Sequence, residues 1–270
     1  MFHIANAVKY VLRQHILNVK RIFALSFSHA KKQTVRTSLG IWWTVIRDLV
    51  YFAALTAFRY LLAGNATVDN MHFTVYLILG LVPWFFMNEV ISGGALAINM
   101  NKPIVESLIF PAVILPTIEA TAIFIKRLFT LTFIFIILYI FEDLSRINYL
   151  LVLYYFIAMY FLMIAYNLFI SAFIAISKDF NQLYATVTRI LMFFMPILWT
   201  FEMFKSNLWL TRILKSLPFT YIIMGFRDAF IVGGSIPLFY TIYFWVVTLL
   251  LFVFGSIIQY KFRKFYADFI

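Results

Sequence analysis

Long apolar segments recur along almost the whole chain and limit what it can fold into. Each is about 20 residues or longer and carries few charges, which is the length a helix needs to cross the roughly 30 Å hydrocarbon core of a bilayer. Hydrophobic residues make up 64% of the 270 residues, charged residues 12%, and the mean hydropathy is +0.94. Soluble globular domains contain a smaller share of apolar residues and a larger share of charged ones. The chain is therefore predicted to be an all-α membrane protein.

Six segments are predicted to cross the bilayer: 39–63, 73–98, 112–141, 149–176, 182–199 and 237–260. The stretch 201–236 differs, because charged residues interrupt every window of about 20 residues. There we expect two short helices that enter the outer leaflet and return, forming re-entrant external gate helices before the last span. The whole chain is read as a single transmembrane domain.

The N-terminal region, 1–36, begins with an amphipathic pattern over residues 4–28. Apolar residues recur there at spacings of three and four, and basic residues lie on the opposite face. The apolar residues are Ile4, Val8, Val11, Leu12, Val19, Ile22 and Phe23. This pattern favours a basic helix lying in the membrane interface. The alternative is a solvated basic tail.

The connection 99–111, between the second and third spans, predicts a short rigid element. Lys102 and Glu106 are four residues apart, on one face of a helix. Pro103 suits the first turn of such a helix, whereas Pro111 and Pro116 cannot continue one without a break. We expect this element to receive force from a separate motor protein.

The charge distribution predicts the orientation of the chain. With six spans, the side that holds both termini carries twelve Lys or Arg residues against three acids, and the other side carries five Lys or Arg. Basic residues concentrate on the cytoplasmic side of membrane proteins, so both termini are predicted to be cytoplasmic. The same rule accounts for the net charge of +11, and no nucleic-acid partner is expected.

Sequence motifs for catalysis, metal binding and nucleotide binding are missing. The chain has no Cys, and its four His residues lie outside the predicted spans without metal-ligand spacing. It also lacks the G-x-x-x-x-G-K-[ST] loop that cradles phosphates. We therefore expect a chain that is not itself an enzyme and holds no metal or cofactor.

Five cations fall inside predicted spans. Arg59, near the outer end of the first span, can extend to the interface, which leaves Arg47, Lys126, Arg127 and Arg189 within the membrane. Charges at membrane depth are expensive, and two interpretations stay open. In the first, each cation has a structural role: it pairs with an acid such as Asp48, Glu89 or Glu119, or it reaches an interface. In the second, the cations together line a polar or anionic pathway. The 33 Phe and 16 Tyr also have two possible roles, because aromatic residues form belts at membrane interfaces and also stack on sugar rings.

Several short motifs, in order along the chain, resemble one family. They are Leu39-Gly40 with Trp43, Trp84-Phe85-Phe86 after Gly80, Phe110 to Thr117, Lys178-Asp179, Arg189-Ile190-Leu191, Pro196 to Trp199, Pro218 with Tyr221 and Arg227, and Tyr266 to Phe269. Together they are similar to the permease subunit of ABC transporters that export cell-surface polysaccharides. The last motif is most like the teichoic acid branch. The family often has Pro at the position of Asp48, so the inner end of the first span departs from the pattern.

The resemblance implies the type 2 ABC exporter fold, a homodimer, and two copies of an ATP-binding subunit that holds ATP and magnesium. It implies a bacterial cytoplasmic membrane and a lipid-linked glycopolymer as substrate. Coupling to the ATPase is assigned to Lys102, Pro103, Glu106, Leu108 and Phe110. The substrate pathway is assigned to Arg47, Trp84, Phe85, Lys126, Arg127, Arg189 and Trp199. The external gate is assigned to Pro218, Tyr221 and Arg227.

Alternatives remain for the substrate and for the function. Teichoic acid is the first choice for the polymer, with O-antigen or capsular polysaccharide next. A membrane-embedded enzyme acting on lipid-linked sugars would need a catalytic acid near the inner side, for which Glu89, Glu106 and Glu119 are the candidates. An ion-coupled secondary transporter usually has two related halves, and no convincing internal repeat is evident.

Overall fold

Long helices joined by short connections account for nearly all of the computed structural model. It describes residues 2–35, 38–63, 67–68, 71–101, 110–141, 147–204, 206–230, 234, 238–263 and 266. The helices are α1 (Phe2–Leu17), α2 (Val19–Val35), α3 (Trp42–Ala63), α4 (Phe73–Ala95), α5 (Ala97–Met100), α7 (Leu115–Phe141), α8 (Tyr149–Ile176), α9 (Lys178–Phe194), α10 (Leu208–Ser216), α11 (Pro218–Phe230) and α12 (Leu238–Phe262). Short 3-10 turns are η1 (Ala112–Ile114) and η3 (Phe201–Phe204). A two-residue hairpin pairs β1 (Thr67–Val68) with β2 (Met71–His72).

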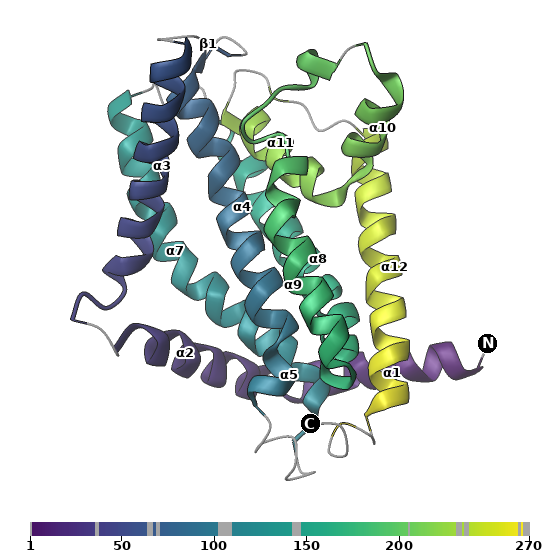
Figure 1. Cartoon of the computed structure of the whole chain (residues 1–270). Coiled ribbons are helices and arrows are strands. Elements are labelled where there is room, and N and C mark those ends of the chain that lie inside the picture. The colour runs from purple at the N-terminus through teal and green to yellow at the C-terminus, as the bar shows by residue number, and fades with distance from the viewer. Residues whose placement is uncertain are drawn as a thin grey trace.

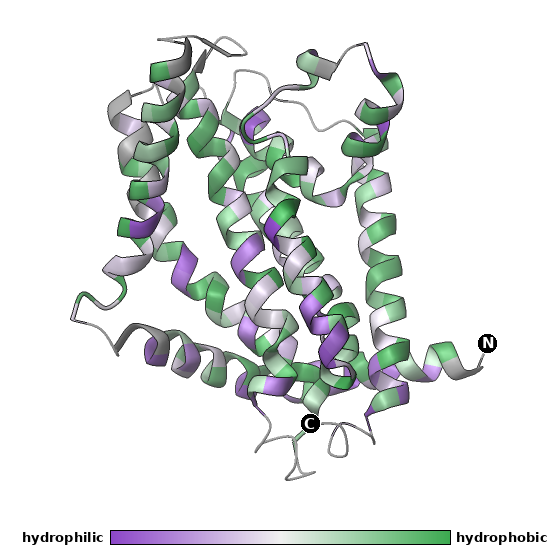
Figure 2. Ribbon diagram, in the orientation of Figure 1, coloured by the Kyte–Doolittle hydropathy of each residue, from purple (hydrophilic) through white to green (hydrophobic). Residues whose placement is uncertain are grey.

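The long helices run side by side, and shorter elements cover the two ends of the bundle (Figure 1). Helices α3, α4, α7, α8, α9 and α12 share roughly one direction, while α1 and α2 lie across one end. Helix α12 ends at that same end, and β1, α10 and α11 lie toward the opposite end. Figure 2 shows that apolar residues dominate the long helices.

Within the described part of the chain, three helices are long and apolar enough to cross a membrane: α4, α8 and α12. The prediction of an all-α membrane protein is therefore confirmed at this level. The remaining predicted spans also fall on helices, but these are more polar or shorter. Helix α3 carries Arg47, Asp48 and Arg59, α7 carries Glu119, Lys126 and Arg127, and α9 has only 17 residues with three charges.

Local sequence explains where several helices begin and end. The side chains of Asn148, Ser177 and Asn207 accept hydrogen bonds from backbone N–H groups at the starts of α8, α9 and α10, which satisfies amides that have no partner within the helix. Helix α9 ends at Phe194, five residues before the predicted end of its span. Met195 is extended (φ −86°, ψ 142°), as expected for a residue that precedes a proline.

The main core lies between α4, α8 and α11, and a second cluster lies under the end that α1 crosses. Helices α4 and α8 approach closely at Gly94, where an added Cβ would lie 2.1 Å from Asn167 Nδ2. Asn167 donates to the carbonyl oxygen of Val90 at 3.0 Å, and the Tyr184 hydroxyl donates to that of Ile91 at 2.8 Å. These side chains tie α8 and α9 to the glycine-containing end of α4.

The N-terminal region forms two helices where one was predicted over 4–28. They meet at Asn18, whose side-chain amide donates to the carbonyl oxygen of Gln14 at 2.8 Å. Helix α1 packs on α12 and helix α2 on α7. Apolar side chains remain exposed along the pair: Leu12, Ile16, Val19, Phe23 and Phe27. An exposed apolar row beside basic residues suits a helix pair lying in a membrane interface.

Candidate functional site

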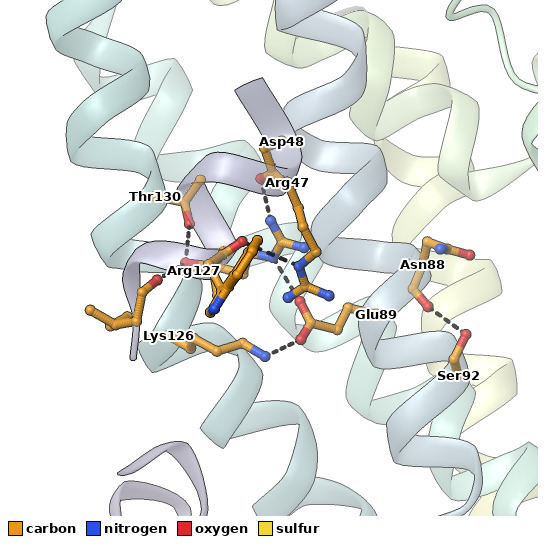
Figure 3. Close-up of polar contacts among 11 residues, drawn as sticks. Arg47, Asp48, Asn88, Glu89, Ser92, Lys126, Arg127 and Thr130 are labelled. Atoms are coloured by element: carbon orange, nitrogen blue, oxygen red, sulfur yellow. Dashed lines mark hydrogen bonds and ion pairs between the residues drawn. The ribbon is translucent and has the colours of Figure 1, made fainter. Parts of the chain in front are cut away.

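Three helices bring four oppositely charged side chains together inside the bundle. Lys126 and Arg127 lie in the middle of α7, Glu89 lies on α4, and Asp48 lies on α3 (Figure 3). These four residues are called the charge cluster below. Lys126, Arg127 and Asp48 are buried, with 5%, 9% and 7% of their surface exposed. A membrane interior disfavours single charges, so such residues are expected to pair.

Each carboxylate in the charge cluster accepts from a cation. Glu89 accepts from Lys126 through Oε1 and from Arg127 Nε through Oε2, the latter at 2.8 Å. Arg127 Nη1 donates to Asp48 Oδ2, so its guanidinium joins α3 to α4. The Arg127 guanidinium carbon also lies 5.9 Å from the ring centroid of Phe85, within the range of a cation–π contact.

The charge cluster is formally neutral, with two cations facing two carboxylates. A buried charge that loses its partner costs several kcal/mol, whereas a paired one is close to balanced. The arrangement therefore clamps α3, α4 and α7 together and leaves no net charge at this depth. Of the two interpretations open from the sequence, pairing with acids is the one this geometry favours for Lys126 and Arg127.

The other two predicted pathway cations have different surroundings. Arg189 is exposed on α9, where the apolar side chains of Val187, Ile190 and Phe193 are also exposed. Arg47 is exposed on α3, and its Nε donates to the carbonyl oxygen of Trp43 at 3.2 Å. Neither belongs to the charge cluster, so the structure divides the four cations into a buried pair and two exposed residues.

The predicted pathway aromatics are also divided between the core and its edge. Trp84 is buried within the main core. Phe85 is half-buried, and its ring lies 5.8 Å from that of Phe52 and 5.4 Å from that of Tyr51. Trp199 is half-buried, and its indole N–H donates to the carbonyl oxygen of Phe193 at 3.0 Å. These residues are not brought together into one wall within this chain.

The predicted external gate residues lie on α11, which Pro218 begins. Arg227 is buried and donates to the carbonyl oxygens of Tyr76, Pro196 and Ile197. Its guanidinium lies 3.6 Å from the Tyr76 ring centroid. Because Tyr76 is on α4 and the two other carbonyls follow α9, Arg227 holds α11 to both. A Cβ on Gly80 would lie 2.3 Å from its Nη2, so a larger residue there would have to displace the guanidinium from these partners.

Tyr221, the remaining predicted gate residue, is part of a hydrogen-bond network. The Tyr221 hydroxyl forms hydrogen bonds with the Tyr154 hydroxyl at 3.1 Å and with Thr241 Oγ1 at 2.8 Å. The indole N–H of Trp245 donates to the Tyr154 hydroxyl at 3.0 Å. This network joins α8, α11 and α12 and holds the Tyr221 side chain of α11 against the other two helices.

The predicted coupling residues lie mostly outside the described part of the chain, since Lys102, Pro103, Glu106 and Leu108 fall within 102–109. Phe110 is described and half-buried, and the Arg21 guanidinium carbon lies 5.8 Å from its ring centroid. The following turn and the start of α7 contact the N-terminal helices. The Ser26 hydroxyl donates to the carbonyl oxygen of Ile118 at 2.9 Å, and His29 Nδ1 lies 3.3 Å from Glu119 Oε2.

His15 makes a further contact between the N-terminal helices and the start of α7. Its Nδ1 lies 2.8 Å from the carbonyl oxygen of Val11, and its Nε2 lies 2.8 Å from Thr117 Oγ1. Nδ1 must donate to the carbonyl, so a neutral ring accepts from Thr117 at Nε2. Burial lowers the pKa of His15, against the opposing effect of the hydrogen bond to Val11.

Tyr266 packs at the same end of the bundle. Its ring is buried in the second cluster, and its hydroxyl donates to Gln259 Oε1 at 2.7 Å. Gln259 in turn donates to the carbonyl oxygen of Leu168 and to Ser171 Oγ, both at 3.0 Å. Burial raises the pKa of Tyr266, so the hydroxyl keeps its proton and its role as donor.

Sequence reasoning missed the polar contacts that connect distant helices. Asn167 and Tyr184, which bind carbonyls of α4, carried no motif. Asp48 and Glu89 were considered as ion-pair partners and are both part of the charge cluster. The one available signal for them was that they are acids inside predicted spans, where charges need partners.

Comparisons with known proteins do not add an identity. No family model matches the chain, and no curated protein matches it. Among the residues that the structure describes, no group of three or more His, Cys, Asp or Glu could hold a metal ion.

Proposed function

We propose that this chain is the permease subunit of an ATP-driven exporter of lipid-linked cell-surface glycopolymers. One arrangement carries the proposal: a basic helix pair crosses the same end of the bundle as α5, and two short helices lie toward the opposite end, before the last long helix. Elements in these positions suit a transporter that receives force on one side and gates a path on the other.

In this proposal the N-terminal helices and the 99–111 connection face a separate ATPase subunit. Contacts of Ser26 and His29 with the start of α7 would move these elements as one body. Stiff, well-seated helices transmit rigid-body motion. Two chains would form the permease, with one ATP-binding subunit beneath each.

The polymer proposed first is an anionic teichoic acid, with O-antigen or capsular polysaccharide as the alternative. The buried pair Lys126 and Arg127 is neutralised by acids, so the cations best placed to attract repeating phosphates are the exposed Arg189 and Arg47. Attraction of an anionic polymer by cations lining a path is an electrostatic steering effect that salt weakens.

The competing enzyme proposal receives less support from the site. An acid catalyst must give or take a proton, yet both Glu89 oxygens accept from cations. Glu119 lies beside His29 near the start of α7, and Glu106 lies outside the described residues. A catalytic role would leave the gate and interface helices without an explanation.

Purification from the native host tests the proposal. The chain should purify as a stable complex with an ATP-hydrolysing subunit, and lipid-linked glycopolymer should stimulate ATP hydrolysis by that complex. A variant of the connection, Glu106→Lys, should keep the complex folded but lose stimulation. A chain that purifies without any ATPase, or a complex that ignores the polymer, would contradict the proposal.

Topology is tested separately with single cysteines. In intact cells, an impermeant thiol reagent should label Ser206→Cys in the connection before α10 but not Lys178→Cys at the start of α9. Lys261→Cys is the better probe for the C-terminal end, because Tyr266 is buried in the fold and would react poorly on either side. Labelling of Lys178→Cys would refute the six-span arrangement.

A further inference from the structure

A cavity of about 100 Å³ lies among α8, α10, α11 and α12, toward the end of the bundle that carries the short helices. Its lining residues are Tyr155, Lys215, Thr220, Tyr221, Met224, Gly225, Asp228 and Tyr240. The proposed export function gives this cavity no occupant. Its volume suits a small polar group, and a chain of sugars would not fit.

The cavity combines aromatic walls with charges of both signs. Tyr155, Tyr221 and Tyr240 supply rings, Lys215 comes from α10, and Asp228 comes from α11. The Lys215 ammonium lies 5.0 Å from the ring centroid of Phe201, within the range of a cation–π contact. A cation and an anion lining one small space fit a ligand that carries both charges, because each ligand charge then meets its opposite.

Thr220 adds a polar group that points to a ligand. The residue is 1% exposed, and its hydroxyl oxygen is buried without a hydrogen-bond partner. Buried polar groups nearly always have a partner. The neighbouring Tyr221 hydroxyl, by contrast, already bonds to Tyr154 and Thr241. The Thr220 hydroxyl is therefore available to a phosphate oxygen.

The side of the cavity formed by α12 meets a surface suited to hydrocarbon. Tyr240 is 38% exposed, and Leu238 and Phe239 just before it are 72% and 75% exposed. Exposed apolar residues continue along α12: Ile242, Val246, Leu249, Leu250 and Phe254. An acyl chain lying on this face would place its head group at the depth of the cavity.

We propose that the cavity binds the zwitterionic head group of phosphatidylethanolamine from the outer leaflet. Lys215 and Thr220 bind the phosphate, while Asp228 accepts hydrogen bonds from the primary ammonium, which packs against the tyrosine rings. Free phosphoethanolamine shares this chemistry but lacks the acyl chains that α12 would hold. The inference depends on membrane insertion and on α10 and α11 facing outward, and it is independent of whether the chain exports a polymer.

Native mass spectrometry of the purified full chain tests lipid selectivity. Phosphatidylethanolamine should bind about tenfold more tightly than phosphatidylcholine or phosphatidylglycerol with the same acyl chains, because a trimethylammonium cannot donate to Asp228 and a glycerol carries no charge. Lys215→Gln, Asp228→Asn and Thr220→Val should each reduce the preference. The matched controls Lys261→Gln and Asp179→Asn, which are exposed in the last turn of α12 and the first turn of α9, should keep it.

A second measurement uses the unaltered chain and so does not depend on how variants fold. Phosphatidylethanolamine should protect Lys215 from an amine-reactive reagent, and phosphatidylcholine should not. Equal binding of the lipids, no protection, or a preference that survives all three cavity variants would overturn the proposal. Free phosphoethanolamine binding as tightly as the lipid would overturn the lipid source. A chain that does not export polymer but keeps its lipid selectivity would contradict the proposed function and leave the lipid site standing.

Discussion

The cations of α7 and the cation of α9 lie in opposite surroundings. Lys126 and Arg127 are buried and bound to carboxylates of neighbouring helices, whereas Arg189 is exposed on a face that mixes polar and apolar side chains. A buried pair contributes to holding helices together, and an exposed cation contributes to what approaches the surface. Position in the bundle, and not residue type, separates a structural charge from one available to a ligand.

Removing the central acid should produce the largest effect. Glu89→Gln leaves Lys126 and Arg127 with a single carboxylate between them, and we expect a loss of about 3–5 kcal/mol in folding free energy. Thermal unfolding in nanodiscs measures it. The double variant Glu89→Gln/Lys126→Met restores neutrality and should recover part of the loss. The exposed Asp179→Asn serves as control, and equal effects of Glu89→Gln and Asp179→Asn would show that the cluster is not a clamp.

Adding a side chain beside Arg227, with Gly80→Ala, should cause the next largest loss of folding free energy. In Gly80→Ala the new Cβ would displace the guanidinium from its carbonyl partners, at a cost of about 1–3 kcal/mol. Gly93→Ala in the same helix is the matched control, because its nearest neighbour is Ile123 Cδ1 at 3.3 Å. If both variants unfold at the wild-type temperature, Arg227 does not hold α11 to α4.

The buried His15, at the end of the bundle that α1 and α2 cross, should give a smaller, pH-dependent effect on stability. Burial lowers the pKa of His15 below its ordinary value of 6.5, so the unfolded state binds the proton more readily than the folded one. His15 therefore contributes full stability above about pH 6.5, and this contribution is lost as the pH falls from there toward the lowered pKa. Unfolding measured at pH 7.5 and 5.5 should show a steeper loss for the wild type than for His15→Gln. His29 and Glu119 remain in both proteins, and an identical slope would contradict the prediction.

Arg189→Gln should have the smallest effect on stability, within about 0.5 kcal/mol, because the side chain is exposed. If the proposed function is correct, it should still slow export of a phosphate-rich polymer and leave a neutral polymer unaffected. Reconstituted export of both polymers at low and high salt measures this. Equal transport of the two polymers before and after the change would remove Arg189 from the pathway.

Much of the helical framework was predictable because apolar runs and helix-breaking residues are local signals. The fourth predicted span matches α8 at both ends, 149–176. The predicted fifth span ran through Pro196, although a proline favours an extended residue before it and α9 stops at Phe194. The break at Asn18 between α1 and α2 was missed, because an amphipathic pattern continues across it.

The candidate site was less predictable because its contacts join residues far apart in the sequence. Asp48 and Arg127 are 79 positions apart, and Glu89 and Lys126 are 37 apart. The sequence could name these residues as possible partners, but it could not show which cations were paired. The same limit applies to Arg227, whose partners are carbonyl oxygens that every residue possesses.

Transport by the reconstituted complex tests the central proposal most directly. The chain and its ATP-hydrolysing partner are placed in vesicles with lipid-linked glycopolymer on the side that hydrolyses ATP, and polymer reaching the other side is measured. We predict movement that requires ATP and is abolished by Glu106→Lys in the coupling connection. Movement that continues without ATP, or no movement although the complex hydrolyses ATP in response to polymer, would contradict the assignment of this chain as an exporter permease.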